Sequence, residues 1–514
     1  MDCRQPTPVA YRWEMPLDPR TPVLIGGGQV NQRTADGDPG REPVDLIVEA
    51  ARLASADSGI ANGHVLAAID SVRIVSLLSW RYRDAGALVA ERIGASPRQT
   101  AITTPGGNSP QSLVNRTALD IAAGRNDVVL IGGAEAWRTR MSFRATGDRP
   151  AWTQQDESIP EAEVLGDAFT MTHPAEMNRG IIMPVQVYPL FEQALRAAAG
   201  RSIDDHLVHI SELWSRFSLV AASNPNAWSQ QAYTAEEIRT PGPDNRWIGF
   251  PYPKLMNSNN SVEQGAALLM CSVEAAERAG IPRERWVFPQ SGSDAHDTDA
   301  LSHRGDLHSS PAIRAVGRQA LDLAGVGIDD VTHVDLYSCF PSAVEIGASE
   351  LGLPDDDPTR PLTVTGGLSF AGGPWNNYVT HSIATMIGVV RDDPGSIGLC
   401  SANGGFITKH SIGLYSTEPP HDGFKWSDAQ DEADRLTKPR DVAPEDHEGD
   451  VTIEAWTVMH SREGAPENGI AAALLPDGRR TWGTTQDPDV LKAMTVEEFI
   501  GRAAHLDGNG GLRF

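Results

Sequence analysis

The sequence predicts a duplicated α/β fold with mostly parallel sheets, a helical insertion and a small β-rich domain at the C-terminal end. Two observations support this prediction. The same order of helices and strands occurs twice, once within residues 49–136 and again within residues 317–405. Beyond residue 417 the composition changes, and residues 451–485 carry the alternating pattern and turn residues of β-strands.

The repeat is the stronger of the two observations. In each copy an amphipathic helix precedes an apolar strand, over 49–76 and over 317–340. Each copy then continues with a double glycine, a helix of about four turns, a polar turn, an apolar strand and a second double glycine, over 106–136 and 372–405. Two such units on one chain predict two similar halves with largely parallel sheets. We expect the helices that start near Gly107 and Gly373 to pack together at the centre.

A long insertion separates the two copies. Residues 140–260 are rich in Trp, Pro and Asn, and two stretches, 187–200 and 207–223, have helical periodicity. An insertion of this length beside an α/β core usually shapes a binding cleft. The alternative is a helical lid without a role in ligand binding.

The C-terminal region has a different character. Residues 418–450 are acidic and contain proline, which predicts a linker. Strands at 451–461 and 468–485 and a helix at 489–502 predict a small, OB-like β domain that is an independent module. The predicted divisions are 20–285 and 286–417 for the two halves, 418–450 for the linker and 451–514 for the added domain.

Bulk properties exclude several classes of function. The 514 residues carry a net charge of −25, which argues against a surface that coats nucleic acid. Residues 419–514 hold 19 acidic and 10 basic side chains, so a protein partner suits this region better than nucleic acid. The four cysteines (Cys3, Cys271, Cys339 and Cys400) lack metal-site spacing, and no apolar run is long enough to span a membrane. We therefore expect a cytoplasmic protein.

Five sequence motifs resemble motifs of the thiolase superfamily and occur in the same order along the chain. They lie at residues 127–136, 257–280, 334–340, 366–374 and 401–405. The resemblance covers about residues 20–417 and implies a five-layer α/β/α/β/α core. It points to the type-1 thiolase-like proteins, which carry an added C-terminal domain and resemble acetyl-CoA acetyltransferases. It also implies a coenzyme A thioester as the ligand, with no covalently bound cofactor.

The same resemblance implies that the usual thiolase chemistry is missing. The nucleophilic cysteine of thiolases corresponds to Gly107, and the histidine that activates it corresponds to Gly373. The two other catalytic motifs read Tyr337–Phe340 and Ala402-Asn403-Gly404. The implied substrate-binding residues are Gly107, Asn108, Ser109, Tyr337, Gly373, Asn376, Asn377, Asn403, Gly404 and His410. An acyl-CoA or lipid thioester would then bind without covalent catalysis.

Two other readings remain open at this stage. Cys339 is either a displaced nucleophile or a small buried hydrophobe, and His381 is either its base or a histidine satisfied within the core. If both are catalytic, the protein is an acyltransferase with a reorganised site. In the third reading the protein is an adaptor that binds a protein partner through 451–514. The assembly is expected to be a monomer or a homodimer.

Overall fold

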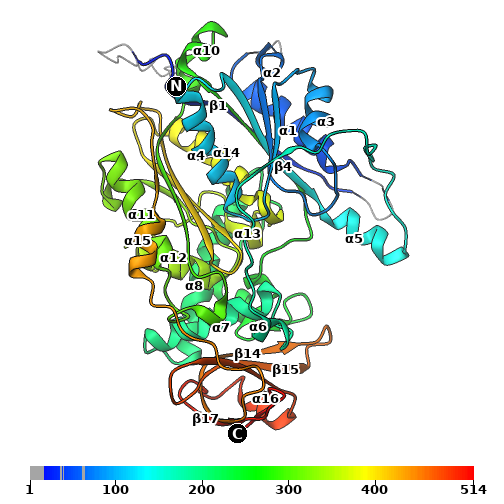
Figure 1. Cartoon of the computed structure of the whole chain (residues 1–514), viewed down its shortest axis with the longest axis vertical. Helices are drawn as coiled ribbons and strands as arrows, with labels where there is room; N and C mark the ends of the chain where they lie inside the picture. The colour runs from blue at the N-terminus through cyan, green and yellow to red at the C-terminus, as the bar shows by residue number, and fades with distance from the viewer. Residues whose placement is uncertain (1–16, 35–37, 39, 61–63) are drawn as a thin grey trace, which may run out of the picture.

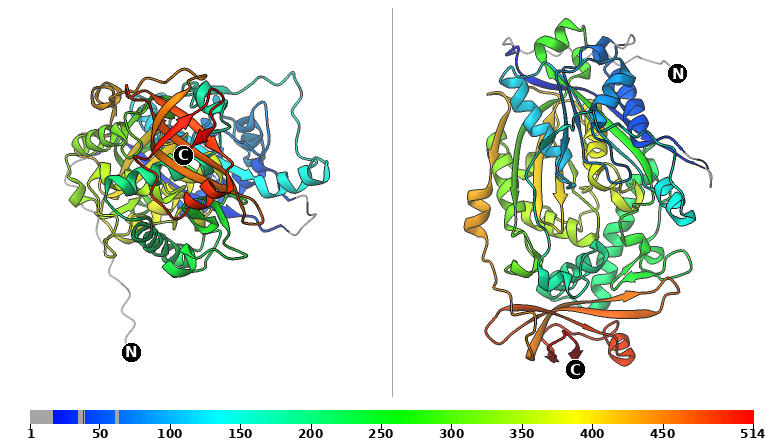
Figure 2. Two further views of the ribbon diagram at one scale, coloured as in Figure 1. Left: turned by 90° about the horizontal axis from the view of Figure 1, so that it is seen from below. Right: turned by 45° about the vertical axis from the view of Figure 1, so that its right-hand side comes forward.

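The computed structural model describes residues 17–34, 38, 40–60 and 64–514. Two mixed β-sheets with helices between and outside them form most of the molecule (Figure 1). A third, strand-rich unit that contains the C-terminus covers one end (Figure 1). The first described strand, β1, and the C-terminus thus lie toward opposite ends of an elongated molecule, and the helical insertion lies between the sheets and the C-terminal unit (Figure 2).

The first half of the chain forms a six-stranded sheet in the order β1-β8-β4-β2-β3-β5. Strand β8 runs antiparallel to β1 and β4, whereas β4, β2, β3 and β5 are parallel. Helices α1 and α3 pack on the outer face of this sheet. The bounds are β1 Pro22–Asn31, α1 Pro43–Asp57, α2 His64–Ala67, β2 Ser71–Ile74, α3 Ala85–Ile93, β3 Gln99–Thr103, α4 Ser109–Ala122, β4 Val128–Ala136, β5 Glu163–Leu165, β8 Glu263–Ser272 and α10 Val273–Arg278.

The second half repeats this topology. Its sheet has the order β10-β11-β12-β9-β13, with β12 antiparallel to β11 and β9, and β10 parallel to β11. Strands β9, β12, β11 and β10 therefore match β1, β8, β4 and β2 in order and direction. The bounds are β9 Phe288–His296, α11 Pro311–Ala324, β10 His333–Asp335, α12 Pro341–Leu351, α13 Gly367–Phe370, α14 Tyr378–Asp392, β11 Gly398–Gly404 and β12 Lys409–Ser416.

Helices α4 and α14 form the layer between the two sheets. Each contacts strands of both sheets, and the two helices contact one another (Figure 1). They start just after Gly107 and Gly373, as the repeat predicts. Close approach needs small residues: a Cβ on Gly27 of β1 would lie 3.0 Å from the Cα of Ala384 on α14. The predicted duplicated five-layer core is confirmed.

The insertion is helical, as expected, and joins the core to the C-terminal unit. Helix α7 packs on α12 of the second half and on strand β14 of the C-terminal sheet. The predicted helices at 187–200 and 207–223 correspond to α7 and α8. The bounds are α5 Trp137–Thr146, α6 Pro174–Met177, α7 Pro184–Ala198, α8 Ile203–Ser223, α9 Ala235–Arg239, β6 Trp247–Gly249 and β7 Tyr252–Pro253. Within the described part of the chain, no helix is both long and apolar enough to cross a membrane.

The segment 418–450 contains more structure than a linker. Strand β13 (Lys425–Asp428) pairs in parallel with β9, and helix α15 (Gln430–Leu436) packs on α11. Its acidic side chains suggest a solvated linker, but Phe424, Ala429 and Ala433 are buried against the second half. These few apolar residues anchor the segment to the core, and an acidic composition alone does not reveal them.

The C-terminal unit is mainly antiparallel, as predicted, and it contacts the rest of the chain directly, while its independent folding stays a prediction. Strand β6 of the insertion pairs with β14, and Trp482 belongs to the same apolar cluster as the core. The helix predicted over 489–502 ends at Ala493, and Phe499, which follows it, is buried against Trp456. The bounds are β14 Gly449–His460, β15 Pro466–Leu474, β16 Arg480–Thr485, α16 Pro488–Ala493, β17 Ala503–Leu506 and β18 Leu512–Arg513.

Candidate functional site

The turn before α4 is held from the other half of the molecule. The side-chain oxygen of Asn376 accepts a hydrogen bond from the Gly106 N–H at 3.1 Å, and its amide nitrogen donates to the Ser76 carbonyl at 3.0 Å. The neighbouring Asn377 donates to the Gly133 carbonyl at 2.7 Å. Neither asparagine caps its helix with its side chain. Both instead fix the start of α14 against the first sheet.

Gly107 lies where Tyr337 and Asn403 leave no space for a side chain. A Cβ built on Gly107 would lie 2.5 Å from the Tyr337 hydroxyl and in contact with the Asn403 carbonyl oxygen. Gly404 is similarly close to the Asn108 side chain. The volume that a side chain at position 107 would need is therefore filled by Tyr337 and the Asn403 backbone.

Gly373, like Gly107, has no space beside it for a side chain. A Cβ at this position would overlap the Ser258 hydroxyl. The Gly373 N–H donates to Asn259 at 3.0 Å, and its carbonyl accepts from Asn260 at 2.8 Å. Residues 258–260 thus take the space in which the resemblance would place an activating histidine.

Cys339 and His381 lie in separate environments. Cys339 is buried beside Tyr188, and burial raises the pKa of its thiol to about 12. His381 is buried on α14 with its Nδ1 2.9 Å from the Gln29 side-chain oxygen, and burial lowers its pKa to about 3. Cys339 contacts Tyr188 whereas His381 contacts Gln29, so the two residues share no partner. A protonated thiol without a base is a poor nucleophile.

Replacing His381 with glutamine is expected to flatten the acid side of the stability profile. Since the pKa of His381 in the folded protein lies below that of a free histidine, stability is lost as the pH falls from about 6.5 towards 3. The slope of unfolding free energy against pH should decrease by about 1.4 kcal/mol per pH unit over this window. Denaturant unfolding at several pH values measures it. An unchanged slope in the His381 variant would contradict the buried, neutral assignment.

A cavity of about 660 Å³ runs along the exposed side of α4. At the N-terminal end of the helix it is lined by Asn108, Ser109, Lys409 and His410. Leu113, Leu119, Leu165 and Phe169 supply apolar walls further along. Two of these walls, at 165–169, come from the insertion. The cavity combines a polar end with an apolar channel, the usual character of a small-molecule site.

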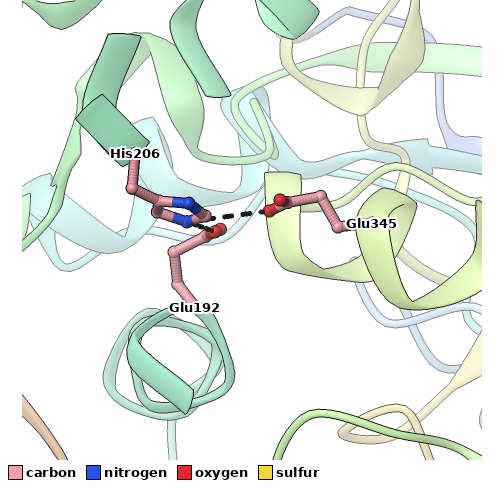
Figure 3. Close-up of side chains that lie close together, drawn as sticks. All are labelled: Glu192, His206 and Glu345. Carbon is pink, nitrogen blue, oxygen red and sulfur yellow. Dashed lines mark hydrogen bonds and ion pairs between the residues drawn. The ribbon is translucent and has the colours of Figure 1, made fainter. Parts of the chain in front are cut away.

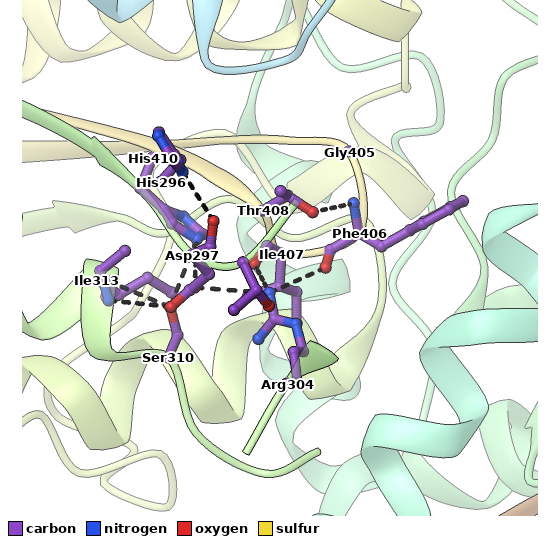
Figure 4. A network of polar contacts seen from close by, with 12 residues as sticks. His296, Asp297, Arg304, Ser310, Ile313, Gly405, Phe406, Ile407, Thr408 and His410 are labelled. Carbon is purple, nitrogen blue, oxygen red and sulfur yellow. Dashed lines mark hydrogen bonds and ion pairs between the residues drawn. The ribbon is translucent and has the colours of Figure 1, made fainter. Parts of the chain in front are cut away.

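A buried network of polar contacts around Asp297 holds His410, which lines the cavity near the N-terminal end of α4 (Figure 4). The Asp297 carboxylate accepts from the Ser310 hydroxyl at 2.5 Å and lies 3.2 Å from His410 Nε2 and 3.5 Å from Arg304. Burial opposes ionisation, but Arg304 and His410 more than offset it, so the pKa of Asp297 is lowered. Asp297 therefore orients the His410 ring at the cavity wall.

Lys409 places a cationic group beside the turn. Its ammonium donates to the Pro105 carbonyl at 2.7 Å, and burial lowers its pKa. A Cβ on Gly106 would lie 2.8 Å from the ammonium nitrogen. The turn, the helix N-terminus and this ammonium together form an environment that favours a polarised carbonyl or an anion.

The far end of the cavity is basic, a feature that the sequence patterns do not reveal. Arg116 and Arg125 line both this cavity and an adjoining one of about 270 Å³, to which Arg73 and Arg98 also contribute. The side chains of Arg116 and Arg125 are 61% and 57% exposed although both pair with Asp120. Arg116 lies on α4 and Arg125 follows its end, and the fold brings Arg73 and Arg98 beside them from earlier in the chain.

The predicted site residues therefore divide into groups. Asn108, Ser109 and His410 line the cavity, where Lys409 joins them, and Gly107, Tyr337, Asn403 and Gly404 pack behind the turn. Asn376 and Asn377 position the turn and α14. Gly373 belongs to a separate packed loop, and Cys339 and His381 are buried away from the large cavity, whose lining includes neither.

Comparison with known proteins gives consistent results. Residues 430–510 match the family model described as the thiolase-like protein type 1 additional C-terminal domain. The chain is 36% identical to a monomeric SCP2-thiolase-like protein type 1 from Mycobacterium smegmatis, with a TM-score of 0.82 over 97% of this chain and 100% of that one. Human mitochondrial 3-ketoacyl-CoA thiolase is 15% identical, with a TM-score of 0.54 over 78% of this chain and 100% of that one, and shares the fold.

A curated relative is more distant. Acetyl-CoA acetyltransferase from Methanocaldococcus jannaschii is 23% identical over 267 residues, which is 52% of this chain. The match spans only 60% of that protein's own length.

Proposed function

Because this chain belongs to the SCP2-thiolase-like protein type 1 family, we propose that it binds an acyl-CoA or related lipid thioester without performing thiolase chemistry. The observation that carries the proposal is the cavity along α4, which is polar at one end, apolar in the middle and basic at the other. Coenzyme A has the matching sequence of groups: a thioester, a pantetheine arm and phosphates on adenosine.

The dimensions of the cavity suit an extended ligand. Helix α4 has 14 residues, which corresponds to a length of roughly 21 Å. The phosphates would lie beside Arg116 and Arg125, whose exposed guanidinium groups can donate paired hydrogen bonds. Leu113 and Leu119 would contact the arm along the helix. The thioester carbonyl would then reach the turn at Asn108 and Lys409.

The proposal excludes an acyl-enzyme at the turn for a steric reason. Tyr337 fills the volume next to Gly107, so the ligand would meet backbone and amide groups instead of a thiol. The reorganised acyltransferase that uses Cys339 and His381 is disfavoured, because the Cys339 thiol is protonated and His381 contacts Gln29. The adaptor reading has less support, since strand β14 of the C-terminal unit pairs with β6 and packs on α7 of the insertion.

We further infer that the chain is a monomer, as the Mycobacterium smegmatis relative is described to be. Strand β5 of the insertion pairs with β3 and covers the edge of the first sheet that would otherwise be open. Strand β5 is only three residues long, and Glu163 and Val164 are exposed, which makes it a poor template for a further strand.

The double variant Arg116→Gln/Arg125→Gln is expected to weaken coenzyme A binding by about 100- to 10,000-fold, because it removes two charge-assisted contacts that are each worth about 1.5–3 kcal/mol. Isothermal titration with coenzyme A, acetyl-CoA and octanoyl-CoA measures this. Arg479→Gln, an exposed arginine of the C-terminal unit, serves as the matched control and should bind as the parent does. Equal affinity in the double variant, or no binding to the parent protein, would contradict the proposed site.

A further inference from the structure

A second chemical cluster lies far from α4, where the insertion meets the second half. Glu192 of α7, His206 of α8 and Glu345 of α12 point toward one another in the buried interior (Figure 3). His206 Nε2 lies 2.5 Å from a Glu192 oxygen and 4.0 Å from Glu345 Oε2. One ligand atom from each of the three residues lies within 4.8 Å of the others.

The polar atoms of this cluster are incompletely hydrogen-bonded within the protein. Glu192 receives a hydrogen bond from the Tyr252 hydroxyl, but Glu345 Oε2 is buried without a hydrogen-bond partner among the described residues. Burial and the neighbouring Glu192 raise the pKa of Glu345 to about 8. Burial also lowers the pKa of His206 to about 4, which keeps its ring neutral. A neutral imidazole thus meets two carboxyl groups, one of which has a buried oxygen that receives no hydrogen bond from a donor group among the described residues.

We propose that Glu192, His206 and Glu345 bind one divalent transition-metal ion of the zinc class. Imidazole nitrogen and carboxylate oxygen are ligands that such ions take at about 2.0–2.2 Å, and three ligand atoms this close can reach a common centre with small side-chain rotations. The ion would balance the two carboxylates and give Glu345 Oε2 its missing partner. Protons held by the carboxylate pair would be released to solvent on binding.

The surroundings decide which of two overlapping ligand sets is used. His209, Glu345 and Asp355 form a second group that could hold an ion. His209 Nε2, however, is already engaged with Asp355 at 3.1 Å and Glu345 at 3.4 Å, and His209 and Asp355 are only partly buried, whereas all three residues of the inner group are buried. The inner group is left as the metal site.

Arg201 is the group that competes with a bound ion. Its guanidinium lies 3.4 Å from His206 Nδ1 and 3.5 Å from Glu345 Oε1. When Nε2 binds the ion, the imidazole proton lies on Nδ1, so Arg201 must turn toward Glu345 Oε1. Its side chain is 33% exposed, which leaves room for that movement. Removing this positive charge should tighten metal binding.

The position of the cluster indicates a structural ion. The three ligands come from α7 and α8 of the insertion and from α12 of the core, so one ion would join the two parts. Helix α7 also carries Arg196, which pairs with Glu498 of the C-terminal unit at 2.6 Å. Loss of the ion should therefore loosen the insertion and the domain that rests on it.

The test is a zinc titration of chelator-stripped, full-length protein, with bound metal measured by elemental mass spectrometry and stability by thermal unfolding. We expect about one equivalent of Zn²⁺ and a rise in Tm of roughly 5 °C. Replacing Zn²⁺ by Co²⁺ should give the visible absorption of a nitrogen- and oxygen-ligated ion. Glu345→Gln and His206→Asn should each lose most of the bound metal, whereas Arg201→Gln should bind it more tightly.

His333→Asn, which removes a partly exposed histidine paired with Asp393, is the matched control and should keep the full equivalent. The proposal is overturned if the stripped parent protein binds no zinc and its Tm does not move, which would leave a proton-sharing network. It is equally overturned if Glu345→Gln and His206→Asn bind as much zinc as the parent. Should either variant fail to fold, the titration of the parent and of Arg201→Gln still decides.

Discussion

Replacing Arg480 with methionine is expected to cost about 3–5 kcal/mol of unfolding free energy, since it leaves buried partners without their cation. The guanidinium is fully buried and binds both oxygens of Glu454 at 2.7 Å. It also donates to the carbonyls of Leu301 and Arg304, at 2.9 and 2.6 Å. Arg480 thus joins the C-terminal sheet to the loop after β9. Chemical denaturation compared with the parent protein measures the loss.

The neighbouring Arg479 provides the control for this experiment. Its guanidinium pairs with Asp477 at the surface, so Arg479→Met should leave the denaturation midpoint unchanged. Arg480→Lys should recover only part of the loss, because an ammonium cannot bind both carboxylate oxygens and the carbonyls together. Parent-like stability of Arg480→Met would mean that the C-terminal sheet folds independently of the core.

Replacing Gly107 with cysteine is expected to leave thiolysis of acetoacetyl-CoA undetectable and to destabilise the protein by about 1–3 kcal/mol, as overpacking does. The new Cβ would lie 2.5 Å from the Tyr337 hydroxyl and against the Asn403 carbonyl. Even if the site relaxes, the thiol lacks an activating base, because Gly373 and its packed loop occupy the equivalent place. A coupled thiolysis assay and denaturant unfolding measure the two effects.

Gly388 on α14 is the matched control for a glycine substitution. No heavy atom lies within 4 Å of a Cβ built there, so Gly388→Ala should stabilise the helix slightly, by about 0.5–1 kcal/mol. Measurable thiolysis by Gly107→Cys would show that a base does reach the turn. The account of a sealed thiolase centre would then fail.

Much of the fold follows from the sequence because repetition is visible there. The double glycines before α4 and α14 and the two matching helix–strand patterns place the central layer correctly. The packing of residues 418–514 cannot be predicted from the sequence. It depends on a few residues, such as Phe424 and Trp482, whose burial is not indicated by the neighbouring sequence. A charged segment such as 418–450 can form a strand when its few apolar residues pack against parts of the chain that are distant in sequence.

The candidate site was predictable only where it lies next to a motif. Gly107 and Tyr337 lie close together although they follow strands of different sheets, β3 and β10. The basic end of the cavity has no motif, because Arg73 and Arg98 come together with Arg116 and Arg125 only through tertiary packing. The metal cluster is hidden for the same reason: Glu192, His206 and Glu345 lie on three helices, two of them in the insertion.

The central claim, that an acyl-CoA thioester binds here without forming an acyl-enzyme, is tested most directly by mass spectrometry with a panel of acyl-CoAs. We predict that native spectra show a one-to-one complex and that denatured spectra show the mass of the unmodified chain. The Cys339 thiol, with its pKa near 12, should carry no acyl group. A stoichiometric acyl adduct on Cys339 in the denatured protein, or the absence of any complex in the native spectra, would contradict the account.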